Sequence, residues 1–96
     1  MAKEQHKWTE DDDRIAFYMY RYGARFLPKM DAGIAKLMGT SEGSLARRRA
    51  NFAFLDGKPG LPNFAKQSQR IYEEHKSATE SEFRAIVLRA LEAKPQ

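Results

Sequence analysis

Apolar residues recur along this chain at the three- and four-residue spacing of amphipathic helices. One face of the first such stretch carries four of them: Ile15, Tyr18, Met19 and Tyr22. Thr9 precedes the stretch as an N-cap, and the acidic residues 10–13 place negative charge at the positive end of the helix dipole. Gly23 follows as a left-handed C-cap. The pattern therefore predicts a helix from Thr9 to about Gly23.

Two further helices follow after a short connection. In the first of them the apolar residues again share one face: Met30, Ile34, Leu37 and Met38. Gly39 ends this helix, and a hydroxyl residue, Thr40 or Ser41, caps the next one. The third helix keeps Leu45 inward and continues to about Leu55.

The last third of the chain predicts two more helices beyond a loop. Two glycines and two prolines fall within residues 56–63, so this segment is expected to be a loop. A fourth helix is expected to start near Asn63, with five residues on its inner face: Phe64, Ser68, Ile71, Tyr72 and His75. Thr79 and Glu82 form a capping box for a fifth helix. The inward residues of that helix are Phe83, Ile86, Val87, Ala90 and Leu91.

These elements predict an all-α fold, a compact bundle of about five helices. No stretch alternates apolar and polar residues with a period of two for long enough to predict a strand. The chain has 96 residues, which is the size of one domain. We therefore predict a flexible N-terminus over residues 1–7 and a single helical domain over 8–93, whose last helix covers 79–93.

Positive charge is concentrated in one part of the chain. The net charge is +4, and residues 41–70 alone hold six basic residues against two acidic ones. The flanking segments, 1–40 and 71–96, carry net charges of +1 and −1. A local basic surface is the electrostatic footprint expected for a polyanion partner, although a solvated arginine-rich helix face gives the same count.

The turn between the second and third helices lies where this charge rises. Ala35 is small enough for the next helix to pack on it, Gly39 can reach positive φ, and Leu45 follows six residues later. This spacing resembles the helix-turn-helix signature of many bacterial and phage regulators, and it predicts a helix-turn-helix over residues 31–55. Two helices that only pack against each other would show the same pattern, which is the other interpretation.

A wider resemblance covers residues 8–76. It depends on the sequences Trp-Thr-Glu-Asp-Asp at 8–12, Leu-Met-Gly-Thr-Ser-Glu-Gly-Ser-Leu at 37–45, Asn-Phe-Ala-Phe-Leu-Asp-Gly at 51–57, Gly-Leu-Pro-Asn at 60–63 and Ile-Tyr-Glu-Glu at 71–74. In these segments the chain is similar to helical DNA-binding modules attached N-terminally to HNH-type nucleases, and more loosely to Myb-like domains. The resemblance implies a helical domain that binds DNA. It does not imply nuclease activity, because His6 and His75 are the only histidines.

The predicted DNA contacts are chosen by the direction in which each side chain points from the third helix. Arg47 points away from the core and is the first candidate to read a base, since bidentate Arg–guanine contact is the commonest specific pairing. Ser44 and Asn51 follow as base-edge or phosphate contacts, although Asn51 can instead hydrogen-bond the following loop. Ser41 and Gly43 lie at the helix end that enters the major groove in this motif. Contacts that position the DNA backbone are assigned to Arg48, Lys58, Lys66 and Arg70.

Three arginines in a row, at 47–49, depart from the usual helix-turn-helix pattern, which places an apolar residue after Leu45. If Leu45 and Phe52 face inward, Arg49 falls on the core side or its edge and Arg48 falls at the opposite seam. Long arginine stems can cover apolar surface at such positions while the guanidinium reaches water or phosphate.

The sequence predicts no enzyme, metal site or cofactor. It has no Cys, two widely separated His and no glycine-rich phosphate loop, which leaves no candidate nucleophile, general base or metal cluster. Consecutive carboxylates at 10–13 point in different directions on a helix, so capping is their expected role. No stretch approaches the roughly 20 apolar residues that span a bilayer, and no signal-peptide pattern opens the chain. A cytoplasmic protein is expected.

The main functional prediction is double-stranded DNA binding, by a small regulator or accessory protein of phage or mobile-element type. The alternative is a helical protein-interaction or dimerisation module without direct DNA contact. The helix at 79–93 bears on this choice, because its apolar face either docks on the other helices or pairs with a second copy in a homodimer. Docking within the chain is the expectation for a protein with so small a core.

Overall fold

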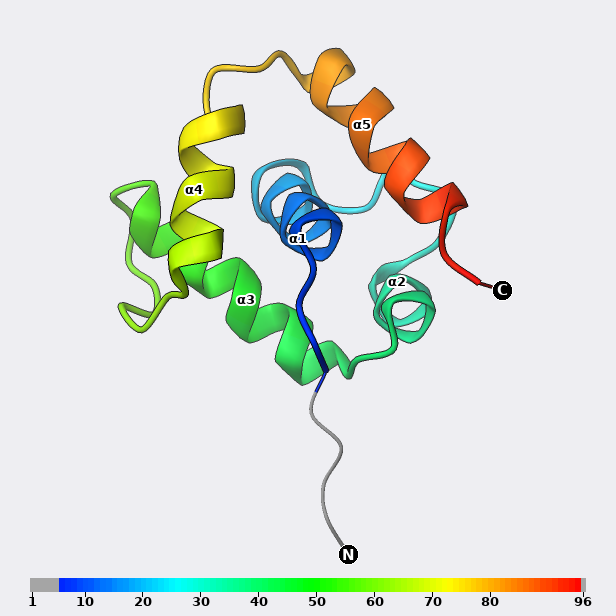
Figure 1. Ribbon diagram of the computed structural model, residues 1–96, viewed down its shortest axis with the longest axis horizontal. Coiled ribbons are helices and arrows are strands. Elements are labelled where there is room, and N and C mark those ends of the chain that lie inside the picture. The colour runs from blue at the N-terminus through cyan, green and yellow to red at the C-terminus, as the bar shows by residue number, and fades with distance from the viewer. Residues whose placement is uncertain (1–5, 96) are drawn as a thin grey trace, which may run out of the picture.

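Five helices form the bundle in the computed structural model, which describes residues 6–95 (Figure 1). Their bounds are α1 Glu10–Tyr22, α2 Asp31–Met38, α3 Glu42–Leu55, α4 Lys66–His75 and α5 Glu80–Glu92. No strand occurs among the described residues, so the predicted all-α bundle is confirmed. Most of the N-terminal segment predicted to be flexible lies outside the described residues.

Helix α1 lies at the centre of the bundle. Figure 1 shows it end-on, with α3, α4 and α5 around it, and all three pack against it. The five consecutive residues 15–19 are completely buried, so α1 is enclosed on every side rather than along one stripe. The predicted single apolar stripe on this helix therefore left out Phe17, which is also buried in the core. Its ring lies 5.0 Å from Phe52 of α3 and 5.3 Å from both Tyr72 of α4 and Phe83 of α5.

Three of the predicted helix starts are confirmed by side-chain caps. Thr9 and Asp12 form a capping box on α1, and the Ser41 hydroxyl accepts a hydrogen bond from the Ser44 amide at 3.0 Å at the start of α3. The predicted capping box of Thr79 and Glu82 opens α5. These caps are interactions between residues three apart, so a local pattern is sufficient to find them.

The start of α4 differs from the prediction. The helix begins at Lys66 rather than near Asn63, and Ala65 precedes it without a side-chain cap. The reason is tertiary: the Asn51 side chain donates to the carbonyl oxygens of Leu61 and Asn63 and holds the preceding segment against α3.

The loop before α4 returns along the C-terminal half of α3. The Lys58 amide donates to the Ala53 carbonyl at 2.9 Å, and the Leu61 amide donates to the Ala50 carbonyl at 3.1 Å. Between them, Gly60 approaches α3 so closely that a Cβ atom would lie 2.3 Å from the Ala50 carbonyl oxygen. Any other residue at position 60 would force the loop away from α3.

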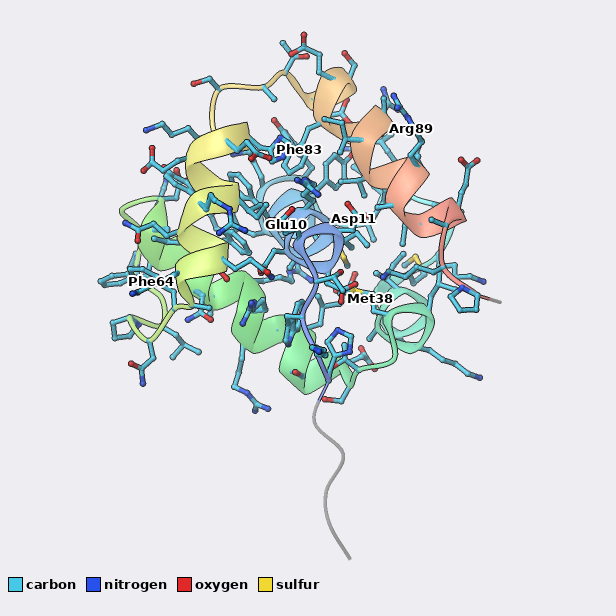
Figure 2. The ribbon with its side chains drawn as sticks, viewed as in Figure 1. Glu10, Asp11, Met38, Phe64, Phe83 and Arg89 are labelled. Atoms are coloured by element: carbon cyan, nitrogen blue, oxygen red, sulfur yellow. The ribbon has the colours of Figure 1, made fainter. Side chains whose placement is uncertain are left out.

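Helix α5 docks on α1 within the same chain. Its residues Phe83, Val87, Ala90 and Leu91 are buried in the common core, and Ile86 is half-buried. Figure 2 shows Phe83 in the space between α4 and α5. The expectation of docking within the chain is therefore confirmed. The face proposed for a homodimer through residues 79–93 is occupied by the chain itself.

His75 is a buried histidine at the end of α4. Its ring stacks on Phe83 at 5.0 Å, and its Nε2 accepts a hydrogen bond from Arg14 Nε at 3.1 Å. Burial lowers the pKa of His75 below its usual 6.5; Glu74, whose Oε1 lies 3.1 Å from the same Nε2, opposes this shift, and the charge of Arg14 adds to it. The folded protein therefore holds this imidazole neutral more strongly than the unfolded chain does.

We expect the protein to lose stability as the pH falls below about 6.5, the unfolded pKa of a histidine, because the unfolded chain binds a proton at His75 more readily than the folded one. The contribution of His75 is fully present above its unfolded pKa and disappears as the pH passes below the lower, folded value. His75→Gln, which keeps an acceptor for Arg14, should flatten this dependence. Thermal unfolding followed by circular dichroism across the pH range tests this, and equal slopes in the two proteins would contradict it.

Candidate nucleic-acid interface

Helices α2 and α3 are joined by a turn of three residues. Gly39 takes the left-handed conformation at φ 82°, as the sequence predicts, and the Thr40 amide closes the turn by donating to the Ala35 carbonyl at 2.9 Å. Ala35 and Leu45 are both buried, so the two helices share one core. The left-handed Gly39, the small Ala35 and the inward Leu45 that the predicted turn requires are therefore all present. One side of α3 remains exposed.

The three consecutive arginines of α3 point in three directions. Arg48 forms a bidentate pair with Asp13 of α1, with Nε–Oδ1 and Nη2–Oδ2 distances of 2.7 and 2.9 Å. Arg49 donates to Asp31 of α2 at 2.7 Å and to the Met19 carbonyl at 3.2 Å, which places it at the edge of the core as expected. Of the three, only Arg47 is exposed, and Arg48 and Arg49 are half-buried. Two of the three arginines therefore attach α3 to its neighbouring helices.

Asp13 collects hydrogen bonds from two helices besides its own. In addition to Arg48, Gln67 Nε2 donates to it at 2.7 Å and the Ser68 hydroxyl donates at 3.0 Å. The carboxylate is completely buried, and the Arg48 side chain is 15% exposed. Capping, the role predicted for residues 10–13, therefore fits Asp12 but not Asp13. The position of Asp13 one helical turn before Phe17 was the available signal, once Phe17 is recognised as facing inward.

The C-terminal end of α3 is also fixed to its neighbours. Asp56, which follows the helix, accepts hydrogen bonds of 2.8 Å from the hydroxyls of Tyr20 and Tyr72. Burial tends to raise the pKa of Asp56, but these hydrogen bonds and the charge of Arg21 outweigh it and lower the pKa. Burial and the bond to Asp56 raise the pKa of Tyr20 to about 12. The helix is thus anchored near both ends by polar contacts.

Asn51 is turned towards the loop, which was one of its two predicted roles. Its Nδ2 donates to the Leu61 carbonyl at 2.9 Å and to the Asn63 carbonyl at 3.2 Å. The residue is 7% exposed. Any contact that Asn51 makes to another molecule is therefore limited to its amide oxygen.

The remaining predicted cations differ in their pairing. Arg70 of α4 pairs with Glu10 of α1. Lys58 and Lys66 are exposed and, like Arg47, form no ion pair with another residue of the described range. Three of the six basic residues in the 41–70 window thus keep their charge available to a partner.

The remaining predicted residues lie near the N-terminus of α3. Ser41 and Gly43 are exposed, and Ser44 is half-buried. Ser44 and Arg47 border an open hollow of about 460 Å³ that is also lined by Trp8 and by the loop before α4. Sequence reasoning did not include Trp8 in the site. Its ring is stacked on Arg48, with the guanidinium 4.6 Å from the ring centroid.

Other kinds of site find no support in the described part of the chain. There, no three His, Cys, Asp or Glu side chains are grouped so as to hold a metal ion. No helix among residues 6–95 has both the length and the apolar character needed to cross a membrane. Comparison with known proteins gives no relative, since no family model, curated protein or solved structure matches the chain. Function is therefore inferred from charge and geometry.

The Asp13–Arg48 pair gives a direct test of how α3 is held. Asp13→Asn leaves the Arg48 charge without its partner, and breaking a buried ion pair in this way costs about 3–5 kcal/mol. We expect a loss of that order in the free energy of unfolding, measured by urea denaturation. Asp11→Asn is the matched control, because Asp11 is half-exposed and its pair with Arg14 should contribute less than about 1 kcal/mol. Equal losses in the two variants would contradict the assignment.

Proposed function

We propose that this protein binds double-stranded DNA through the exposed flank of α3, with α2, the turn and α3 acting as a helix-turn-helix. In this arrangement the N-terminal half of α3 enters the major groove and the loop before α4 faces the DNA backbone. The role that fits is that of a small regulator or accessory protein of phage or mobile-element type. The resemblance of residues 31–55 to helix-turn-helix signatures supports the same proposal.

The observation that carries the proposal is the position of the unpaired positive charge. Arg48, Arg49 and Arg70 are matched by carboxylates of α1 and α2, whereas Arg47, Lys58 and Lys66 are exposed and unmatched within residues 6–95. All three lie on α3 or on the segment from its C-terminal end to the first residue of α4. Five other basic residues of the described range also form no ion pair, and they lie outside this segment: Lys7, Arg25, Lys29, Lys36 and Arg89. What distinguishes the first three is their place on or directly after α3, where unmatched cations can neutralise phosphates of DNA bound to this helix.

The outer surface of α3 is also suited to a groove. Beside Arg47, it presents the small residues Gly43 and Ala46, both exposed. A helix with small outward residues brings its backbone close to the base edges, and alanine methyl groups make apolar contact with thymine methyl groups. The ion pairs at Arg48 and Arg49 hold this surface in place before DNA arrives, so little order has to be gained on binding.

A different observation favours the alternative of a protein-interaction module. Phe54 and Leu61 are 43% and 40% exposed, and the Phe54 ring lies 6.1 Å from the ring of Phe64. These side chains form an apolar patch at the C-terminal end of α3. Exposed apolar patches are typical of protein contacts. The flanking Lys58 and Lys66 are better explained by DNA, so we keep the protein contact as the second candidate.

Arg47→Ala tests the reading of a base. A preferred duplex is first selected from a random pool, and the variant is then titrated on it and on single-base changes of it. If Arg47 contacts a base, its loss should weaken binding to the preferred site by about 1–3 kcal/mol and relax the preference at one position.

Arg89→Ala is the control for Arg47→Ala, because it removes the same charge from α5. Figure 2 shows Arg89 on the opposite side of the view from Phe64, which precedes α4. Its loss should leave binding nearly unchanged. If both variants weaken binding equally on all sequences, Arg47 does not read a base and contributes only its positive charge.

Salt dependence tests the number of phosphate contacts. Each phosphate neutralised contributes about −0.9 to the slope of log affinity against log salt, so three cations predict a slope of about −3 on random duplex. The double variant Lys58→Ala/Lys66→Ala should reduce the slope to about −1. A slope near zero in the unaltered protein would exclude phosphate binding by these residues.

A further inference from the structure

The hollow beside α3 is large enough for a small ligand, and the proposed contacts to a regular duplex do not fill it. It has a volume of about 460 Å³, which falls within the roughly 300–1,000 Å³ of small-molecule sites. Its walls come from α3, from the segment before α1 and from the loop before α4. The residues that matter here are Trp8, Arg47, Asn51, Leu61 and Pro62.

The amide of Asn51 supplies a fixed acceptor to this hollow. Its Nδ2 donates to two carbonyl oxygens, those of Leu61 and Asn63, and only the nitrogen end of an amide can face two carbonyls. The orientation of the amide is therefore determined by the loop. Oδ1 lies at the other end of the amide from these two bonds and has no hydrogen-bond partner among residues 6–95, and it is not sealed from solvent.

The walls and the rim of the hollow match the rest of a nucleotide. Trp8 supplies an aromatic ring, which the Arg48 guanidinium covers on one face, and Leu61 and Pro62 supply apolar surface, so the hollow offers a flat ring an aromatic and apolar lining. Arg47 is exposed at the rim, so the strand whose base it contacts passes the opening of the hollow. An N–H group on the ring would complete the contact by donating to Asn51 Oδ1.

We infer that the hollow receives an extrahelical nucleobase from the DNA bound along α3. Asn51 is too deeply recessed to reach the edge of a stacked base, so the base has to leave the helix to meet it. This inference depends on the proposed function, because the strand that carries the base is the one that Arg47 contacts. It makes unpaired or distorted duplex, rather than regular duplex, the preferred target.

The acceptor requires a donor on the ring that enters the hollow. The amino group of cytosine can donate to Asn51 Oδ1, and so can the ring N–H of uracil, so the acceptor alone does not choose between these bases. An extrahelical abasic residue offers neither a donor nor a ring. An extrahelical cytosine should therefore bind about tenfold more tightly than an abasic residue at the same place in the duplex, which is the order of one base–aromatic contact.

The test uses the full chain and three duplexes of one sequence: fully paired, with one extrahelical cytosine and with one extrahelical abasic residue. Trp8 is the only tryptophan, so its emission reports on the hollow without labelling. We expect the cytosine duplex to bind about tenfold more tightly than the other two and to change Trp8 emission to saturation. Equal affinities for all three duplexes, with the same Trp8 emission, would overturn the inference and leave the proposed function standing.

Two variants and a free nucleotide separate the remaining outcomes. Leu61→Ala removes one wall and should reduce the preference for cytosine, while affinity for the paired duplex stays within about twofold. Met30→Ala, at a residue that directly precedes α2 and is 78% exposed, is the control and should change neither. Failure of every duplex to bind would overturn the proposed function. Quenching of Trp8 by cytidine monophosphate alone, without duplex binding, would overturn the strand as the source of the base.

Discussion

The buried carboxylate of Asp13 determines how three helices fit together. A carboxylate removed from water is stable only when it is paired and its lone pairs are occupied, and here α3 supplies Arg48 while α4 supplies Gln67 and Ser68. A small shift of either helix would separate these donors from the charge. The aromatic contacts of Phe17 lie one turn further along α1, so the polar and apolar parts of the core enforce the same arrangement.

That arrangement changes the meaning of the charge pattern. Counted along the chain, residues 41–70 carry six basic residues, but in space half of them are neutralised by acids of α1 and α2. Pairs in contact produce little field beyond the Debye length of about 8 Å at physiological salt, so the field felt by a distant polyanion comes mainly from unmatched cations. The arginine-rich segment thus divides its charge between holding the fold and presenting a surface.

The parts of this fold that sequence could predict are those that depend on near neighbours. The caps at Thr9, Ser41 and Thr79 and the left-handed turn at Gly39 involve residues a few positions apart, and local patterns are sufficient for them. The errors share a different origin. The late start of α4 and the enclosure of Phe17 depend on contacts with other elements.

The candidate site shows the same division. The sequence correctly predicted that Arg47 points to the surface and that Arg49 lies at the edge of the core. The direction in which a side chain leaves a helix depends only on its position in that helix, so it can be read locally. The partner of Arg48 lies 35 positions away, and several acids of α1 could have served equally well on paper. For the same reason, the sequence could not decide whether Asn51 bonds to the loop or to a ligand. Trp8 is far from α3 in the sequence and reaches the site only because the chain folds.

The two ends of the described chain meet at one residue. Asp12, at the start of α1, lies 2.8 Å from His6 Nε2 and 2.6 Å from Lys94 Nζ. The helices therefore form an almost closed circuit, and the order in which the chain visits them matters less than their packing. A circular permutant joined across this gap and opened at the exposed residues Lys76 and Ser77 would retain nearly every contact of the core. It would also bring α5 directly before α1, the helix on which it packs.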